Sequence, residues 1–277
     1  HGMEPSLRSD AHWVRIPVNA IDEYGAPKTD LSLNDFTILE DGVPQQAQNL
    51  SYEEGPVSLS IVFDASSSME KKLADSRAAL RQLFIGALPE DEYSLVQFSD
   101  APALLAPFTP DSAYIEQAAA KIRPLRFTAL FDAVFFSMQK MRAAKNPRRA
   151  LLILSDGADN YSRYSESELR AFVQETDVRI YSIALPSFDI LNRNTRTLRR
   201  LSELSGGAAL AIDNLNELDE AMLKMSRAMR QEYLLSYVSA NAQRDGLYRR
   251  VEVRLARRPA TSDLHLTWRR GYYAAQE

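Results

Sequence analysis

The stretch Val57-Ser58-Leu59-Ser60-Ile61-Val62-Phe63-Asp64-Ala65-Ser66-Ser67-Ser68 is an apolar run that stops at a carboxylate. Residues 57–63 are rich in β-branched and other apolar side chains, which is typical of a buried strand. Small residues follow Asp64, and the hydroxyls of Ser66 and Ser68 are spaced so that they can turn toward its carboxylate. Oxygen ligands at the end of a buried strand favour a hard metal ion. We therefore interpret the end of this strand as a candidate metal site.

Strands and helices alternate on the C-terminal side of this run. Strands are expected at residues 57–63, 93–98, 149–154, 178–184 and 208–212. Apolar residues at helical spacing predict helices at about 73–87, 111–122, 130–144, from 165 onward, 198–205 and 215–229. A short apolar stretch at 103–108 has no clear periodicity of its own. The alternation predicts an α/β fold whose mainly parallel sheet is covered by helices on both faces.

The two ends of the chain read as strands with no helix between them. The N-terminal strands are expected at 13–20, 36–40 and 45–52, with Asp41-Gly42 as a hairpin signal, and the C-terminal ones at 233–239, 248–255 and 264–268. Because neither group of strands is large enough to be stable alone, we expect the N-terminal and C-terminal strands to pack together in one small, discontinuous β-sandwich. The predicted boundaries are 1–55 for the N-terminal β segment, 56–231 for the α/β domain and 232–277 for the C-terminal β segment.

Composition excludes several classes of protein. The chain has 277 residues, 45% of them hydrophobic, which is enough for one large domain or two modest ones. A net charge of -4 argues against a nucleic-acid partner, and the absence of cysteine excludes a disulfide framework and a thiolate metal site. No apolar run is long enough for a membrane helix. There is no signal peptide, and His1-Gly2-Met3 resembles a cloning remnant, so the compartment cannot be read from the chain itself.

A second carboxylate and a further hydroxyl complete the candidate site. Asp156 follows the strand at 149–154 in the way that Asp64 follows the strand at 57–63, and Thr128 precedes the helix at 130–144. Ligands of open α/β sheets collect beyond the carboxyl ends of the strands. An all-oxygen set of this kind suits Mg²⁺ or Mn²⁺. With at most one carboxylate in direct contact, the ion would stay electropositive and would favour a carboxylate supplied by a partner.

These residues resemble a known family. Asp64-Ala65-Ser66-Ser67-Ser68, Thr128 within Phe127-Thr128-Ala129-Leu130-Phe131-Asp132-Ala133, and Asp156 within Leu154-Ser155-Asp156-Gly157 are similar to the metal-ion-dependent adhesion site of the von Willebrand factor type A domain. The resemblance covers residues 57–231 and implies a doubly wound, Rossmann-like sheet. It implies Ser66, Ser68 and Thr128 as direct ligands of Mg²⁺ (or Mn²⁺ or Ca²⁺), Asp64 as a direct or water-mediated ligand, and Asp156 as a water-bridged one.

The resemblance extends to the flanks of the domain. The segments 35–42, 159–165, 231–237 and 270–273 are similar to a bacterial subgroup first described from acidobacterial genomes, whose members are usually exported. This implies a periplasmic or secreted protein. Lys71 and Lys72 occupy places where integrin β-type relatives have acidic residues, so the sequence predicts one ion rather than two. Phe127 stands where many relatives have glycine.

Three functions remain open from the sequence. The first is a non-enzymatic, metal-dependent protein-binding or adhesion module, with an Asp or Glu of the partner completing the ion's shell. The second is a Mg²⁺-dependent hydrolase or phosphotransferase, although aspartyl-phosphate enzymes need a second carboxylate where this chain has Ser66, and His1, His12 and His265 form no serine–histidine–acid constellation. The third is a structural or assembly subunit that keeps the motif without using a metal.

Three other side chains near the motif allow two readings each. Tyr161 and Tyr164 follow Asp156 closely, where exposed aromatic residues can anchor a partner, but packing within the loop is an equal alternative. For Asp132, which lies near Thr128, we favour a surface or helix-cap carboxylate over a ligand.

Overall fold

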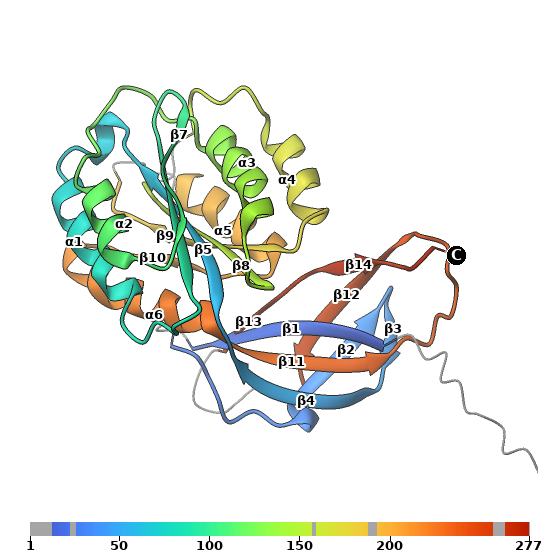
Figure 1. Cartoon of the computed structure of the whole chain (residues 1–277). Helices are drawn as coiled ribbons and strands as arrows, with labels where there is room; N and C mark the ends of the chain where they lie inside the picture. The colour runs from blue at the N-terminus through green and yellow to red at the C-terminus, as the bar shows by residue number, and fades with distance from the viewer. Residues whose placement is uncertain (1–12, 23–25, 157–158, 188–192, 257–263, 277) are drawn as a thin grey trace, which may run out of the picture.

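The computed structural model describes residues 13–22, 26–156, 159–187, 193–256 and 264–276. Figure 1 shows a larger part, in which helices surround a central sheet, and a smaller part made of two further sheets. The central sheet has six strands in the order β10-β9-β8-β5-β6-β7, and each of the smaller sheets has four. The predicted combination of an α/β domain with additional antiparallel sheets is confirmed.

The strand that ends at Asp64 lies inside the central sheet. The six strands are β5 (Val57–Asp64), β6 (Glu92–Phe98), β7 (Pro102–Thr109), β8 (Arg148–Ser155), β9 (Val178–Ala184) and β10 (Ala209–Ala211). β5 pairs in parallel with β6 and β8, and every one of its residues is buried. Because β5 is covered on both faces, it reads as a continuous apolar run rather than as an alternating one.

The apolar stretch at 103–108 forms β7, which pairs antiparallel with β6. The physical reason is the length of the connection. Only Ser99, Asp100 and Ala101 join the two strands, and a parallel crossover needs a dozen or more residues. β7 is also an edge strand with register irregularities, which weakens its periodicity in the sequence.

Six helices cover the sheet. They are α1 (Leu73–Leu83), α2 (Ser112–Ala119), α3 (Leu130–Lys140), α4 (Glu166–Gln174), α5 (Arg193–Ser205) and α6 (Leu218–Arg230), with short 3₁₀ turns η1 (Leu33–Asp35), η2 (Ser67–Met69), η3 (Met141–Ala143) and η4 (Leu215–Glu217). α1, α2 and α6 share one apolar core with one face of the sheet, and α3, α4 and α5 share a second core with the other. The predicted boundaries differ at the ends: α1 stops at Leu83 rather than near residue 87, and α5 begins five residues before the predicted start at Leu198.

The two smaller sheets combine strands from both ends of the chain. The strands are β1 (Trp13–Ile21), β2 (Phe36–Glu40), β3 (Val43–Gln45), β4 (Ala47–Glu54), β11 (Gln231–Val238), β12 (Tyr248–Leu255), β13 (His265–Trp268) and β14 (Gly271–Tyr273). Their orders are β13-β1-β11-β4 and β14-β12-β2-β3. Val18, Ile38, Leu235 and Val253 belong to one apolar core, so the two sheets pack against each other. Asp41 and Gly42, with φ of 48° and 83°, form the expected tight turn between β2 and β3.

The junction between the two parts orients the candidate site. β4 runs directly into β5, and α6 runs directly into β11 (Figure 1). Beside this junction Glu232 forms ion pairs with Arg148, at 2.9 Å, and with Arg179. Because β5 starts at the smaller part, its carboxyl end lies on the far side of the larger part (Figure 1), and Asp64 is the last residue of this strand.

Candidate metal centre

The carboxylate of Asp64 is buried and held in a fixed orientation. Its Oδ1 accepts a hydrogen bond of 2.8 Å from the backbone N–H of Ser66, and its Oδ2 accepts one from the hydroxyl of Ser155. Burial raises the pKa of Asp64 to about 6; the hydrogen bonds from Ser155 and Ser66 oppose this rise, and the negative charge of Asp156 adds to it. The hydrogen bond from Ser155, the residue before Asp156, joins the ends of the two strands that carry these carboxylates.

The two serines of the motif bring their hydroxyls together. Ser66 has extended backbone angles, φ −68° and ψ 166°, just before the 3₁₀ turn η2. This reversal places the Oγ atoms of Ser66 and Ser68 at 3.1 Å from each other. Neighbouring ligands of an octahedral ion with metal–oxygen distances of about 2.1 Å are themselves about 3 Å apart. The serine pair therefore has the spacing of two adjacent Mg²⁺ ligands.

Asp156 is the second buried carboxylate, and only one of its oxygens has a partner. It follows β8 directly and is 4% exposed. Its Oδ2 accepts a hydrogen bond of 3.1 Å from the ammonium group of Lys72, while its Oδ1 has no partner among the described residues. A buried oxygen without a partner costs about 1–3 kcal/mol. A cation beside this oxygen would remove that cost.

Lys72 has a role that its position in the sequence does not reveal. Its side chain is only 14% exposed and pairs with the buried Asp156. From the sequence, Lys71 and Lys72 indicate only that a second metal site is absent. In the structure Lys72 supplies a positive charge to the first candidate site, where it compensates part of the charge of the two carboxylates.

Thr128 lies on a loop that is tied to the loops of both aspartates. Asn160 binds both the backbone N–H and the backbone C=O of Thr128. Its side-chain Oδ1 accepts from Thr128 N at 2.9 Å, and its own N–H donates to Thr128 O at 2.9 Å. On the other side, the hydroxyl of Ser67 donates to Arg126 O at 3.1 Å. The structure thus cross-links the three loops that carry the predicted ligands, through Ser67 and Asn160, neither of which the sequence analysis identified.

Asp132 is neither of the two things expected of it, a surface carboxylate or the cap of its own helix, because it is buried and the N-cap position of α3 is Ala129. Asp132 is 7% exposed, and its Oδ1 accepts from the backbone N–H groups of Arg163, at 2.9 Å, and Tyr164, at 3.2 Å. Its side chain therefore fixes the backbone of the loop between β8 and α4. No sequence signal marks this role, because both donors are backbone groups about 30 residues away.

The two tyrosines that we predicted near the site lie in different surroundings. Tyr161 stacks on Phe127, with ring centroids 4.5 Å apart and planes 6° apart, and its N–H donates to Thr128 O at 3.2 Å. Tyr164 stacks on Phe135 and lines a groove of about 430 Å³ between α3 and α4. Only Tyr161 thus has a direct contact with a predicted ligand residue.

Other kinds of centre find no support in the described ranges. Across 13–22, 26–156, 159–187, 193–256 and 264–276, no three His, Cys, Asp or Glu side chains gather in a way that could hold a metal, so a metal here depends on hydroxyl ligands. His265 lies 3.9 Å from Glu203, while His1 and His12 fall outside the described residues.

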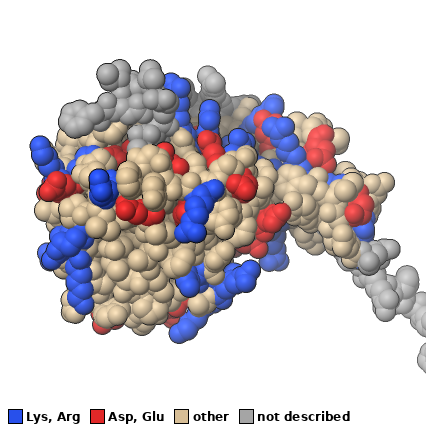
Figure 2. All heavy atoms as spheres, turned by 90° about the horizontal axis from the view of Figure 1, so that it is seen from above, with Lys and Arg blue, Asp and Glu red and all other residues tan. Residues whose placement is uncertain are grey.

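None of the helices in the described part of the chain has the length and apolar character needed to cross a bilayer. Seen from above in Figure 2, positive and negative side chains are mixed, and neither sign forms a continuous field.

Comparison with known proteins finds a family match that spans the candidate site. Residues 59–158 match the family model of the von Willebrand factor type A domain, a range that contains Asp64, Ser66, Ser68, Thr128 and Asp156. No curated protein sequence matches the chain.

Solved structures are similar in fold at low sequence identity. A von Willebrand factor type A protein from Catenulispora acidiphila matches 99% of this chain and 76% of its own, with a TM-score of 0.55 at 11% identity. Proximal thread matrix protein 1 from the mussel byssus, with a zinc-occupied MIDAS motif, matches 69% of this chain at a TM-score of 0.53 and 16% identity, and this chain spans 50% of its length. The corresponding domain of the type V pili tip protein Mfa5 from Porphyromonas gingivalis matches 63% of this chain and 95% of its own, with a TM-score of 0.52 at 12% identity.

Proposed function

Because this chain contains a von Willebrand factor type A domain, we propose that it is a non-enzymatic protein-binding module whose bound divalent cation is completed by a carboxylate of the partner. The observation that carries this proposal is the pair of buried aspartates. Asp64 is hydrogen-bonded to Ser155, the residue before Asp156, both carboxylates are buried, and Oδ1 of Asp156 has no partner among the described residues. A divalent cation would supply the missing positive charge at this point.

Each predicted ligand has a separate part in the proposal. Ser66 and Ser68, with hydroxyls 3.1 Å apart, would bind the ion directly, as would Thr128. Asp64 and Asp156 would bind it directly or through water. Since most of these ligands are neutral, the ion would keep enough positive charge to attract a carboxylate from outside. A partner segment that presents Asp or Glu fits this chemistry.

Magnesium is the ion that we propose for the site, with Mn²⁺ or Ca²⁺ as substitutes. The donor set consists of oxygen atoms only, which suits hard cations. The mussel protein carries zinc in its MIDAS motif, so a site of this kind accepts a divalent transition metal in that protein.

The proposal favours binding over catalysis. Where an aspartyl-phosphate enzyme would place a second carboxylate, this chain has Ser66, which instead lies beside Ser68. We also propose an exported protein with no nucleic-acid partner. The likeness to a pilus tip protein supports export, and the net charge of -4 supports the exclusion of nucleic acid.

Calorimetric titration of the full chain with MgCl₂ and MnCl₂ tests the proposal. The wild type should bind one divalent ion, and Ser66→Ala with Ser68→Ala should weaken binding by at least about tenfold, since two ligands are lost. Ser94→Ala, which removes a buried serine of β6 outside the motif, is the matched control and should bind like the wild type. Equal binding by all three proteins, or none by the wild type, would contradict the proposal.

A further inference from the structure

Three large apolar side chains are exposed beside the candidate site. Two lie on the loop that carries Thr128, and one lies on the loop that follows Asp156. Leu125 is 50% exposed, Phe127 38% and Tyr161 52%. We call these three residues the apolar platform. Single exposed apolar residues are common, but a group beside a candidate binding site marks an interaction surface.

The backbone under the platform is fixed by hydrogen bonds. Leu125 N donates to Ala65 O at 2.8 Å, which ties the platform to the residue after Asp64. Phe127 N donates to the carboxylate of Asp100 at 2.8 Å. Tyr161 N donates to Thr128 O at 3.2 Å. The backbone of the three residues is therefore held in place before a partner arrives, and the stacking of Phe127 on Tyr161 restrains these two rings, which lowers the entropic cost of binding.

The platform lies immediately beside the predicted ligands. Phe127 precedes Thr128 in the chain, and the Tyr161 backbone contacts Thr128 directly. The rings of Phe127 and Tyr161 stack face to face, with centroids 4.5 Å and planes 6° apart, so each covers part of one face of the other and the pair exposes its edges and outer ring faces as one apolar unit. A carboxylate bound at the ion would consequently have this surface next to it.

The fixed charges beside the platform are mixed, because the Asp100 carboxylate lies under Phe127 N while two cationic side chains lie nearby, so the attraction for an acidic partner depends on the cation at the site. The Arg126 guanidinium lies 5.7 Å from the centroid of the Phe127 ring, and Lys71 is exposed on the loop after the serines. Together with a divalent cation, these groups attract a carboxylate and disfavour a segment with Lys or Arg at the same place.

We propose that the partner is a protein segment in which the ion-binding Asp or Glu is adjacent to an apolar, preferentially aromatic, side chain that packs on Leu125, Phe127 and Tyr161. This inference rests on the proposed function, because it assumes that the carboxylate binds at the ion. The platform then selects among carboxylates, which the ion alone cannot do.

Displayed libraries of short random peptides provide the test, one with Glu fixed at the centre and one with Gln. Both are selected on the full chain in MgCl₂ and in EDTA. We expect enrichment from the Glu library only, in MgCl₂ only, with aromatic residues beside the Glu. The variant with Phe127→Ala and Tyr161→Ala should lose the aromatic preference, and the selected peptides should bind it at least about tenfold more weakly.

Control variants separate the ring surface from general effects. Tyr161→Phe keeps the stacked ring and should select like the wild type. Tyr114→Ala removes an aromatic side chain on α2 that is 44% exposed and should also have no effect. If the double variant does not fold, as judged by circular dichroism, Tyr161→Ala alone decides the question, since its ring is more than half exposed.

The outcomes distinguish the two proposals. Mg²⁺-dependent enrichment of Glu without a neighbour preference, or with the same preference in the double variant, would overturn the platform and leave the proposed function standing. Equal enrichment of Glu and Gln that ignores EDTA, yet depends on Phe127 and Tyr161, would overturn the proposed function and the link to it. A selection with no enrichment in either library would overturn both.

Discussion

Buried carboxylates lie at both ends of the central strands, and the charged partners of these carboxylates differ between the two ends. At the amino end, near the smaller sheets, Asp91 pairs with the equally buried Arg230 at 2.8 Å. At the carboxyl end, Asp64 and Asp156 lie close together with Lys72 as the ammonium that pairs with Asp156. The first arrangement matches one negative charge with one positive charge, while the second has two carboxylates.

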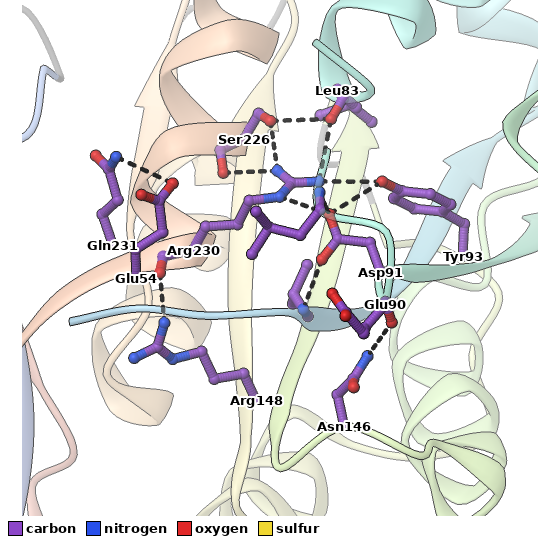
Figure 3. A network of polar contacts seen from close by, with 12 residues as sticks. Glu54, Leu83, Glu90, Asp91, Tyr93, Asn146, Arg148, Ser226, Arg230 and Gln231 are labelled. Atoms are coloured by element: carbon purple, nitrogen blue, oxygen red, sulfur yellow. Dashed lines mark hydrogen bonds and ion pairs between the residues drawn. The ribbon is translucent and has the colours of Figure 1, made fainter. Parts of the chain in front are cut away.

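The Asp91–Arg230 pair at the amino end has all of its polar atoms satisfied. Figure 3 shows Arg230, at the end of α6, reaching Asp91, Tyr93, Ser226 and the carbonyl of Leu83. The Asp91 carboxylate also accepts from the backbone N–H groups of Val57 and Leu88, at 2.8 and 2.9 Å. Such a network fixes the start of β5 and the end of α6 relative to each other.

At the carboxyl end, the described residues do not compensate all of the negative charge or bind every carboxylate oxygen. Oδ1 of Asp156 lacks a partner among the described residues, and the pKa of Asp64 is raised to about 6. Burial of acidic groups is therefore not itself a sign of function in this fold. Incomplete compensation by the chain's own groups is the feature that indicates a place for a cation.

The largest effect is expected from breaking the satisfied end. Arg230→Met leaves the charge of Asp91 buried without its partner, which should lower the free energy of unfolding by about 3–5 kcal/mol. Urea unfolding followed by circular dichroism measures this loss. The double variant Arg230→Met with Asp91→Asn should recover part of it, because no unpaired charge remains. A loss below about 1 kcal/mol for the single variant would show that the network is not a structural requirement.

The second prediction removes charge at the carboxyl end and depends on pH. The pKa of Asp64 lies above its ordinary value of 3.8, so the native state binds the proton more tightly than the unfolded state. The stability of the metal-free wild type should therefore fall as pH rises from about 4 to above 6, by about 3 kcal/mol for a pKa near 6. Asp64→Asn should not show this fall.

Denaturant unfolding in EDTA across this pH range measures the difference between the two proteins. Excess MgCl₂ should close the gap above pH 6 by stabilising only the wild type. Parallel stability curves for the wild type and Asp64→Asn in EDTA would contradict the account of this carboxylate.

The third prediction concerns the ammonium group at the candidate site. Lys72 pairs with Asp156 and adds positive charge where the cation is proposed to bind. Lys72→Met should therefore tighten Mg²⁺ binding by about tenfold, which corresponds to about 1.4 kcal/mol. Calorimetry provides the affinity, with Lys71→Met as the matched control because that lysine is exposed. Weaker binding by Lys72→Met would mean that the lysine supports the ion instead of competing with it.

The smallest effect is expected from the loop that presents Thr128. Asn160→Ala removes one hydrogen bond to Thr128 N and should lower stability by about 1 kcal/mol. It should weaken Mg²⁺ binding only a few-fold, because the other ligands are untouched. Thermal unfolding and calorimetry on the same samples check both values. No change in either would show that the loop is held without this contact.

Sequence patterns reveal the parts of the molecule that depend on short-range chemistry. The apolar run of β5 and its strand-end Asp64 are visible because burial on both faces leaves a continuous signal. The turn at Asp41-Gly42 is visible because few residues accept positive φ. The spacing of Ser66 and Ser68 from Asp64 likewise marks the candidate site.

Other features depend on contacts that form only after folding. The pairing of Lys72 with Asp156 joins residues 84 positions apart, and it forms only when the fold brings the residue before α1 to the residue after β8. Asn160 acts through the backbone of a distant loop, so no pattern of residue types announces it. The same is true of the stacking of Phe127 on Tyr161. The domain boundaries at residues 55 and 231 stay predictions.

Crystals of the full chain grown in MnCl₂ test the central claim most directly, through anomalous diffraction measured above the manganese absorption edge. The account predicts one anomalous peak between the loops of Asp64, Thr128 and Asp156, with the hydroxyls of Ser66 and Ser68 among its ligands. A data set in saturating MnCl₂ with no peak there, or with Mn²⁺ bound only elsewhere on the molecule, would contradict the claim that this end of the sheet is a metal site.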